Sequence, residues 1–205
     1  MAEEAPHPDL FPVLGAERLL VIVTGSLAAT HMTSWSPWLS MGYPRLRRRV
    51  VLTSSATRFV SHTALTAMEP NPVLVDAWSD DPTEKPLHVD LAVWPDAVIV
   101  YPASFHFLAR FAVGLGDTPA MLALQCTSAP VAVAPSVPPG AAGSLVYRKH
   151  VEALRERDNV VVVDPVPGMS AHTGGYDAAV AAPLPDVLTG VESLRRALVG
   201  VGTPC

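Results

Sequence analysis

An unbroken apolar run that stops at a proline is the feature that most restricts how this chain can fold. Residues 97–101 (AVIVY) have the length of a strand and are followed directly by Pro102-Ala103-Ser104. A helix-like pattern then begins at Phe105 and is closed by Gly114 and Gly116. Continuous apolar runs are typical of strands buried on both faces of a parallel sheet. This order predicts the carboxyl-terminal edge of such a sheet, which is where open α/β folds bind ligands.

The same alternation of strand and helix patterns extends along the chain. Apolar runs predict further strands at 19–24, 50–52, 73–75, 131–134 and 160–163. Helices are expected after several of them, at 117–127, 144–157 and 187–199. Six strands that alternate with helices predict an α/β fold with one doubly wound parallel sheet.

Composition indicates one domain and limits its partners. The chain has 205 residues, of which 49% are hydrophobic, and this suits a single domain over residues 19–205. Residues 1–18 are expected to form a disordered arm, because their first part is acidic and rich in proline. The net charge of −5 argues against a nucleic-acid partner. The apolar run at 19–29 is too short to span a membrane.

The two cysteines indicate a reducing environment. Cys126 lies in an apolar helical pattern and is expected in the core, and Cys205 ends the chain. They form neither a zinc-binding pattern nor a disulfide framework, and no other metal site is indicated. We therefore expect a cytoplasmic protein.

Small and hydroxylated residues follow the first two strands. Gly25-Ser26 and Leu27 come directly after the first, where a glycine lets the backbone approach a ligand and Ser26 adds a hydroxyl. This suits a phosphate, although the same pattern also occurs in proteins that bind none. Thr53 and Ser55 follow the second strand and are either helix caps or further phosphate contacts. The arginines at 47–49 are expected to be a solvated entry to that strand.

Residues 164–186 are rich in glycine, proline and alanine and show no regular period. A long segment of this kind in a compact domain is usually a functional lid or a disordered loop. We predict a mobile substrate lid that orders over a bound ligand.

Several of these motifs occur in the order found in the flavin-dependent cysteine decarboxylases, which the chain resembles over about residues 19–175. This family includes the phosphopantothenoylcysteine decarboxylases of coenzyme A synthesis and the lantibiotic decarboxylases of the epidermin and mersacidin type. The resemblance rests on Gly25-Ser26-Leu27-Ala28-Ala29, Thr53-x-Ser55-Ala56 with Phe59, His88, Asp96, Pro102-Ala103-Ser104, Gly114-x-Gly116-Asp117 and Pro135. It implies a Rossmann-like flavoprotein that binds FMN, with FAD possible, and that assembles as a homotrimer or homododecamer.

The resemblance also implies which residues contact the flavin. These are Gly25, Ser26, Leu27, Thr53, Ser55, Phe59, Ala103, Ser104, Phe105 and His106. His106 stands where the family has an asparagine, and Pro138 stands where another family asparagine holds the substrate carboxylate. Ser136, or the backbone amides around Gly140 and Ala141, are candidate replacements for that second group.

One residue in the loop near the end of the chain, at 168–172, indicates which branch of the family the chain resembles. In the coenzyme A branch, a cysteine in this loop reduces the enethiol intermediate, whereas the corresponding residue here is His172, a candidate substrate contact. Nor does the sequence carry a synthetase domain. The resemblance therefore implies oxidative decarboxylation of the C-terminal cysteine of a ribosomal, lanthipeptide-type precursor peptide to an enethiol. The alternatives are a phosphopantothenoylcysteine decarboxylase and a non-catalytic, flavin-binding regulatory subunit.

His88 is the candidate catalytic base. The reaction removes a thiol proton, and an imidazole with a pKa near 6.5 is well matched to a thiol near 8.5. Sequence position alone would make His88 a surface histidine just before the 97–101 strand, whereas the matching family histidine faces the flavin from a neighbouring subunit.

Overall fold

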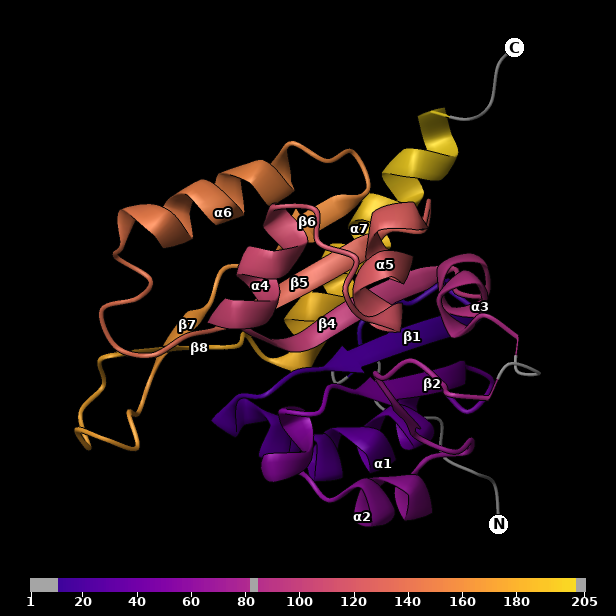
Figure 1. Cartoon of the computed structure of the whole chain (residues 1–205), viewed down its shortest axis with the longest axis horizontal. Coiled ribbons are helices and arrows are strands. Elements are labelled where there is room, and N and C mark those ends of the chain that lie inside the picture. Colours follow the sequence, from indigo (N-terminus) through magenta and orange to yellow (C-terminus); the bar gives the residue numbers. More distant parts are fainter. Residues whose placement is uncertain (1–10, 82–84, 202–205) are drawn as a thin grey trace.

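The computed structural model describes residues 11–81 and 85–201. Its centre is an all-parallel sheet of six strands in the order β3-β2-β1-β4-β5-β6 (Figure 1). The strands are β1 (Arg18–Val23), β2 (Arg47–Leu52), β3 (Leu74–Val75), β4 (Ala97–Ser104), β5 (Val131–Ser136) and β6 (Val160–Val162). The order reverses between β1 and β4, which confirms the predicted doubly wound α/β fold.

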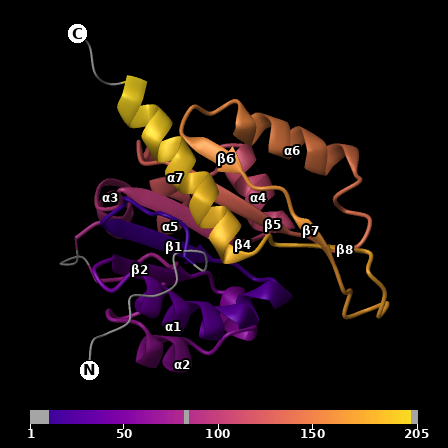
Figure 2. The ribbon, with the colours of Figure 1, turned by 180° about the vertical axis from the view of Figure 1, so that it is seen from behind.

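Helices cover both faces of the sheet (Figures 1 and 2). One face carries η1 (Leu27–His31), α1 (Met32–Gly42), η2 (Ala56–Arg58), α2 (His62–Met68) and α7 (Leu184–Val201). The other carries α3 (Leu87–Val93), α4 (Phe105–Ala112), α5 (Pro119–Cys126) and α6 (Leu145–Arg155). Within the described ranges, no helix combines the length and the apolarity needed to cross a lipid bilayer.

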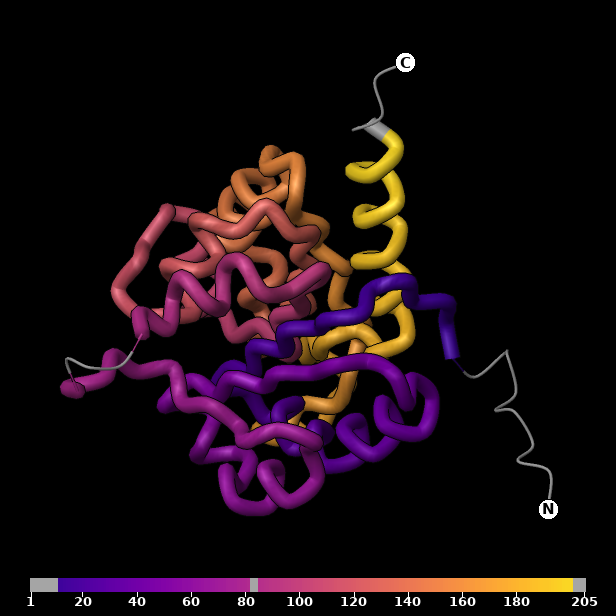
Figure 3. The backbone as a smooth tube through the Cα atoms, turned by 90° about the vertical axis from the view of Figure 1, so that its right-hand side faces the viewer, coloured from indigo at the N-terminus to yellow at the C-terminus, as the bar shows by residue number. Residues whose placement is uncertain are grey.

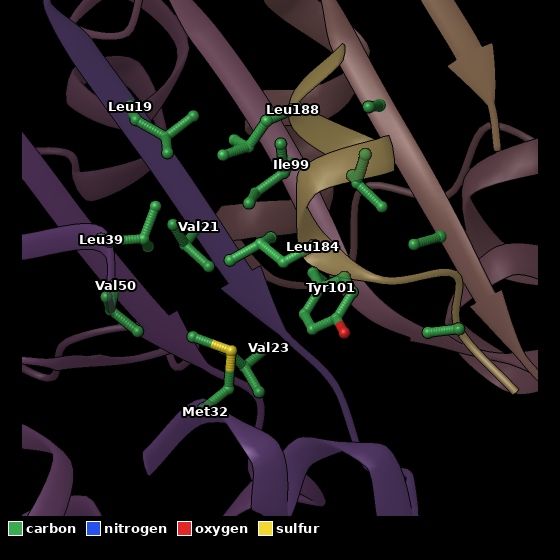
Figure 4. Close-up of a cluster of buried hydrophobic side chains, with 14 of the residues drawn as sticks. Leu19, Val21, Val23, Met32, Leu39, Val50, Ile99, Tyr101, Leu184 and Leu188 are labelled. Atoms are coloured by element: carbon green, nitrogen blue, oxygen red, sulfur yellow. The ribbon is translucent and has the colours of Figure 1, made fainter. Parts of the chain in front are cut away.

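The side chains of each central strand pack alternately into two separate hydrophobic cores, one on each face of the sheet. In β1, Leu19, Val21 and Val23 pack toward α1 and α7, as Figure 4 shows, whereas Leu20 and Ile22 pack toward the opposite helices. All five side chains are almost completely buried, which explains why the strand is apolar without a break. Burying one such side chain contributes about 1.5–3 kcal/mol to the free energy of folding. The buried strands therefore hold their carboxyl ends in fixed positions.

The predicted disordered arm, residues 1–18, is only partly testable, because its first part lies outside the described residues. Its later part packs against the domain. Phe11 stacks on Trp38 with 4.8 Å between the ring centroids, and the amide of Gly15 donates to Glu192 Oε2 at 3.0 Å. Figure 3 shows this stretch beside α7. The prediction of disorder is therefore wrong from residue 11 onward, because an aromatic side chain anchors the segment.

Two further expectations need correction, the first of them for Arg48 alone, since Arg47 is exposed and Arg49 is partly exposed. Arg48 is buried with only 2% of its side chain exposed, and its Nε lies 3.1 Å from Oε2 of Glu69, which is equally buried. Polar groups of α1 and of the residue after α2 enclose this guanidinium, so it is not a solvated strand entry. Cys126 is exposed rather than in the core, because it is the last residue of α5 and the buried face of that helix ends at Leu124.

The segment at 164–186 contains regular structure that the sequence pattern does not predict. Strands β7 (Val166–Gly168) and β8 (Ala178–Val180) form an antiparallel hairpin that projects from the domain (Figure 1). The amide of Val137, just beyond β5, donates to the carbonyl of Ala179 at 2.8 Å. The hairpin is thereby attached to the carboxyl end of the main sheet.

Candidate functional site

A cavity of about 870 Å³ opens at the carboxyl ends of the central strands, between them and the β7–β8 hairpin. This is the edge at which the sequence predicts ligand binding. Ligand pockets commonly span roughly 300–1,000 Å³, so the main cavity has room for a cofactor and part of a substrate. The candidate site residues that line it are Gly25, Ser26, Leu27, Ser55, Ser104, Phe105, His106, Ser136 and His172.

The other candidate residues lie outside this lining. Thr53 and Ala103 are buried behind it, although the hydroxyl of Thr53 lies 3.1 Å from that of Ser55. Phe59 follows η2 and is 39% exposed. Gly140 lies in the turn before α6, and the neighbouring amide of Ala141 already donates to the carbonyl of Pro138. The backbone amide of Ala141 is thus not free to bind a substrate carboxylate.

Gly25 allows two strand-end loops to come together. A Cβ atom at this position would lie 2.6 Å from both Cβ and Oγ of Ser55, which no real side chain tolerates. Only glycine therefore permits the loop after β1 to contact the loop after β2. The resulting cradle presents backbone and the hydroxyl of Ser55 to the main cavity, with Ser26 beside them, and such groups suit a phosphate.

Hydrogen bonds connect the strand ends across the sheet. Ser26 Oγ donates to Ser136 Oγ at 2.8 Å, which links the loop after β1 to the end of β5. Because Ser136 accepts this bond, its own hydroxyl proton is free to donate into the main cavity.

Thr24 is a positioning residue that the sequence analysis missed. Its Oγ1 donates to the carbonyl of Pro102 and accepts from the amide of Ser104, both at 2.7 Å. Ser104 in turn caps α4 by accepting from the amide of Phe107. These bonds fix the end of β4 relative to β1. The sequence signal that could have identified Thr24 is its place as the single polar residue at the end of an apolar strand pattern.

Phe105 and His106 begin α4 and line the cavity. The ring of Phe105 stacks on Tyr147 of α6 with centroids 6.5 Å apart, and it also makes an edge contact with the ring of His150. The phenyl ring is therefore held between α4 and α6, where it can support a planar ligand.

The main cavity contains no permanently charged side chain among its described lining residues. It has no Asp, Glu, Lys or Arg, and its only ionisable nitrogens are those of His31, His106 and His172. No group of three or more metal-ligating side chains occurs in the described part of the chain. Anionic ligands would therefore be held by histidines, hydroxyls and backbone amides.

His88 lies elsewhere, in a second cavity of about 470 Å³ whose described lining shares no residue with the main cavity. It belongs to the first turn of α3, not to the approach to β4. Its ring meets the edge of Trp78 with 5.5 Å between centroids, and Trp78 Nε1 donates to the carbonyl of Asp117. His88 Nδ1 is buried and has no hydrogen-bond partner among the described residues.

Asp76, which the sequence analysis also missed, supports the wall of this second cavity. It is 4% exposed and accepts from the amide of Ala120 at 2.8 Å. Burial raises the pKa of this carboxyl, and the bond from Ala120 opposes that shift. The contact holds the start of α5 beside β3. Nearby, the Arg110 guanidinium lowers the pKa of Asp117, and the charge of His106 has the same effect.

Comparison with known proteins agrees with this geometry. The chain is 31% identical over 182 residues to the cypemycin cysteine dehydrogenase (decarboxylating) of a Streptomyces species, covering 89% of this chain and 93% of that protein. It is 27% identical over 158 residues to the coenzyme A biosynthesis bifunctional protein CoaBC of Haemophilus influenzae. That match covers 77% of this chain and only 39% of the bifunctional protein.

Solved structures share the fold. The cypemycin decarboxylase CypD has a TM-score of 0.75 and 29% identity, covering 91% of this chain and 98% of that one. The FMN-dependent cysteine decarboxylase TvaF from thioviridamide biosynthesis has a TM-score of 0.69 and 26% identity, with 87% and 98% covered. These likenesses confirm the Rossmann-like α/β fold. The family described as Flavoprotein matches residues 13–194, and the chain therefore belongs to the Flavoprotein family.

Proposed function

We propose that this protein is an FMN-dependent enzyme that oxidatively decarboxylates the C-terminal cysteine of a ribosomally made precursor peptide to an enethiol. The observation that carries the proposal is the main cavity. Its lining includes both the cradle that Gly25 makes possible, which suits a phosphate, and the β7–β8 hairpin. The similarity to the cypemycin cysteine dehydrogenase supports the same reaction class.

The cavity residues fit FMN at its phosphate end and along its ring. Gly25, Ser26 and Ser55 would hold the phosphate, with Thr53 behind them. Ser104, Phe105 and His106 would lie along the ring system. Bound flavin supplies a hydride acceptor, and loss of hydride from the cysteine Cβ leaves a thioaldehyde whose C=S group can take up the electrons released with CO2. FMN is favoured over FAD because TvaF is FMN-dependent.

The protein must also accept the thiol proton, and His88 is the proposed base. Because His88 lines a different cavity from the flavin contacts, one chain does not bring it to the reacting thiol. A neighbouring copy would supply it, as in a homotrimer or homododecamer. The residue type suits this role, because a neutral imidazole has one nitrogen that can accept a proton, and His88 lines a cavity in the first turn of α3.

A phosphopantothenoyl substrate fits the main cavity less well. Such a substrate carries a second phosphate beside that of the flavin, and the described lining offers no Lys or Arg to neutralise it. A peptide that carries only its terminal carboxylate brings less negative charge for the cavity to neutralise. A purely regulatory flavin-binding role would give no turnover in the assay below.

Substitution of His88 by Asn tests the proposal. The purified wild-type protein should be yellow and should convert a peptide ending in cysteine to a product that lacks CO2 and two hydrogens, measured by mass spectrometry. His88→Asn should keep the flavin and lower the rate by about 10²–10⁴-fold, as is typical for loss of a general base.

The matched control is His62→Asn, because His62 lies in α2 outside both cavities and bonds the carbonyl of Val73. It should react at the wild-type rate. A colourless wild-type protein that takes up neither FMN nor FAD would overturn the proposed function. Enethiol formation by His88→Asn at the wild-type rate would remove His88 from the mechanism and make His106 the next candidate.

A further inference from the structure

The ionisable groups of the main cavity do not match the charge of the proposed ligands. FMN brings a phosphate and the peptide brings an α-carboxylate, yet no Lys or Arg lines the cavity in the described part of the chain. A carboxylate that leaves water loses several kcal/mol of hydration unless charged or polar donors replace it. The three histidines of the lining are the only side chains that can become cations there.

The three histidines occupy different parts of the wall. His31 ends η1, the short helix that follows Ser26, and so belongs to the proposed phosphate end. His106 begins α4, close enough to Asp117 to lower the pKa of that carboxyl, and the Arg110–Asp117 ion pair therefore shares its surroundings. His172 lies in the hairpin segment, between β7 and β8.

The turn that carries His172 is closed by its own hydrogen bonds. Ser170 is 4% exposed, and its Oγ accepts from the amides of His172 and Thr173 at 3.3 and 3.2 Å. The backbone of Ser170 also pairs with Gly174 and Gly175 at 2.8 Å each. These contacts close the local turn that carries His172 beside the cavity.

The acidic side chain of the hairpin, Asp177, already has a hydrogen-bond partner. Asp177 accepts from Thr173 Oγ1 at 2.8 Å, within the same turn. In the same cavity lining, Ser136 presents a hydroxyl proton that its bond from Ser26 leaves free. A carboxylate in this part of the cavity would meet an imidazole donor from the hairpin segment and a hydroxyl donor from the end of β5.

We infer that His172 binds the terminal carboxylate of the peptide substrate through an imidazole N–H, with the Ser136 hydroxyl as the second donor. This inference rests on the proposed function. It makes His172 a specificity-determining residue that selects chains ending in a free α-carboxylate over amidated chains. It leaves His31 and His106 to contact the flavin, because His31 ends the helix that follows Ser26 of the cradle and His106 lies in the first turn of α4.

The test compares two peptides that end in cysteine, one with a free carboxylate and one with a carboxamide. Their dissociation constants for the FMN-loaded protein are measured by titration calorimetry. The wild-type protein should bind the carboxylate roughly ten- to a hundredfold more tightly, the range expected for a charge-assisted hydrogen bond. His172→Gln should bring this ratio close to one, whereas His172→Lys, which supplies a cationic N–H donor, should restore much of it.

The His62→Gln control should leave the ratio at the wild-type value, because His62 lies outside the cavity. A His172→Gln protein that still discriminates like the wild type would overturn the inference. The same protein batches are assayed for enethiol formation. Turnover by the wild type with unchanged discrimination in His172→Gln would refute this inference alone, whereas a wild type without turnover would refute the proposed function.

Discussion

The main cavity has two walls that are built in different ways. The strand wall, formed by residues 25–27, 55, 104–106 and 136, sits on the ends of buried strands, and hydrogen bonds cross-link these strand ends. The hairpin wall, residues 166–180, is held mainly by bonds within itself and by one bridge to Val137. Its largest apolar side chains, Met169 and Tyr176, are 64% and 75% exposed.

Under the proposed function, this difference between the two walls separates cofactor binding from substrate binding. A cradle fixed by the main sheet is preorganised for a ligand that stays bound, which lowers the entropy cost of binding it. A short hairpin with few buried anchors can reorder around a peptide that must enter and leave, as expected of a lid. Changes in the strand wall should therefore affect flavin first, and changes in the hairpin wall should affect peptide first.

The largest effect is expected for Gly25→Val. Its side chain would collide with Ser55 and separate the two loops of the phosphate cradle. Loss of two charge-assisted hydrogen bonds to the phosphate would lower flavin affinity by about a hundredfold or more. The ratio of flavin to protein absorbance in the purified variant measures this.

The control is Gly175→Ala in the hairpin wall, where a Cβ would meet its nearest neighbour at an ordinary 3.5 Å. It should bind flavin normally. Circular dichroism of the flavin-free proteins shows whether Gly25→Val is still folded. A folded Gly25→Val protein with full flavin content would contradict the assignment of the cradle.

A smaller effect is expected when the hairpin is shortened. Residues 169–177 are replaced by Asn-Gly, which closes a two-residue turn between the paired residues Gly168 and Ala178. Flavin content should not change, whereas kcat/KM for the peptide should fall by about tenfold or more, because the substrate loses one wall of its site. Unchanged peptide kinetics would refute the lid, and loss of flavin would show that the walls are not independent.

The smallest effects are expected at the hydrogen bond that joins the strand ends. Ser26→Ala and Ser136→Ala both remove the neutral hydrogen bond between these two side chains. Ser26→Ala should therefore weaken FMN binding and Ser136→Ala should weaken peptide binding, each by roughly two- to tenfold, the usual value of one neutral hydrogen bond. Fluorescence titration with FMN and peptide kinetics measure the two separately. If both variants lose flavin equally, Ser136 belongs to the cofactor site rather than to the substrate site.

The sequence predicted the parts of the site that are local. Glycine, serine and threonine at strand ends are visible as interruptions of apolar runs, and parallel strands bring all such ends to one edge of the sheet. Eight of the nine candidate residues in the main cavity lie at or just after β1, β2, β4 and β5. The ninth, His172, was found through the resemblance alone, since its segment has no period that predicts a hairpin.

The sequence by itself determined the doubly wound sheet, because the strands are continuous apolar runs and alternate with helices along the chain. Only the tertiary structure decided that Arg48 is buried with Glu69 and that residues from Phe11 onward pack on α1. It also decided that His88 lines a cavity apart from the proposed flavin contacts. Periodicity reports which face of an element is buried. It does not report which distant element covers that face, so the position of a single polar side chain depends on partners that lie far away in the sequence.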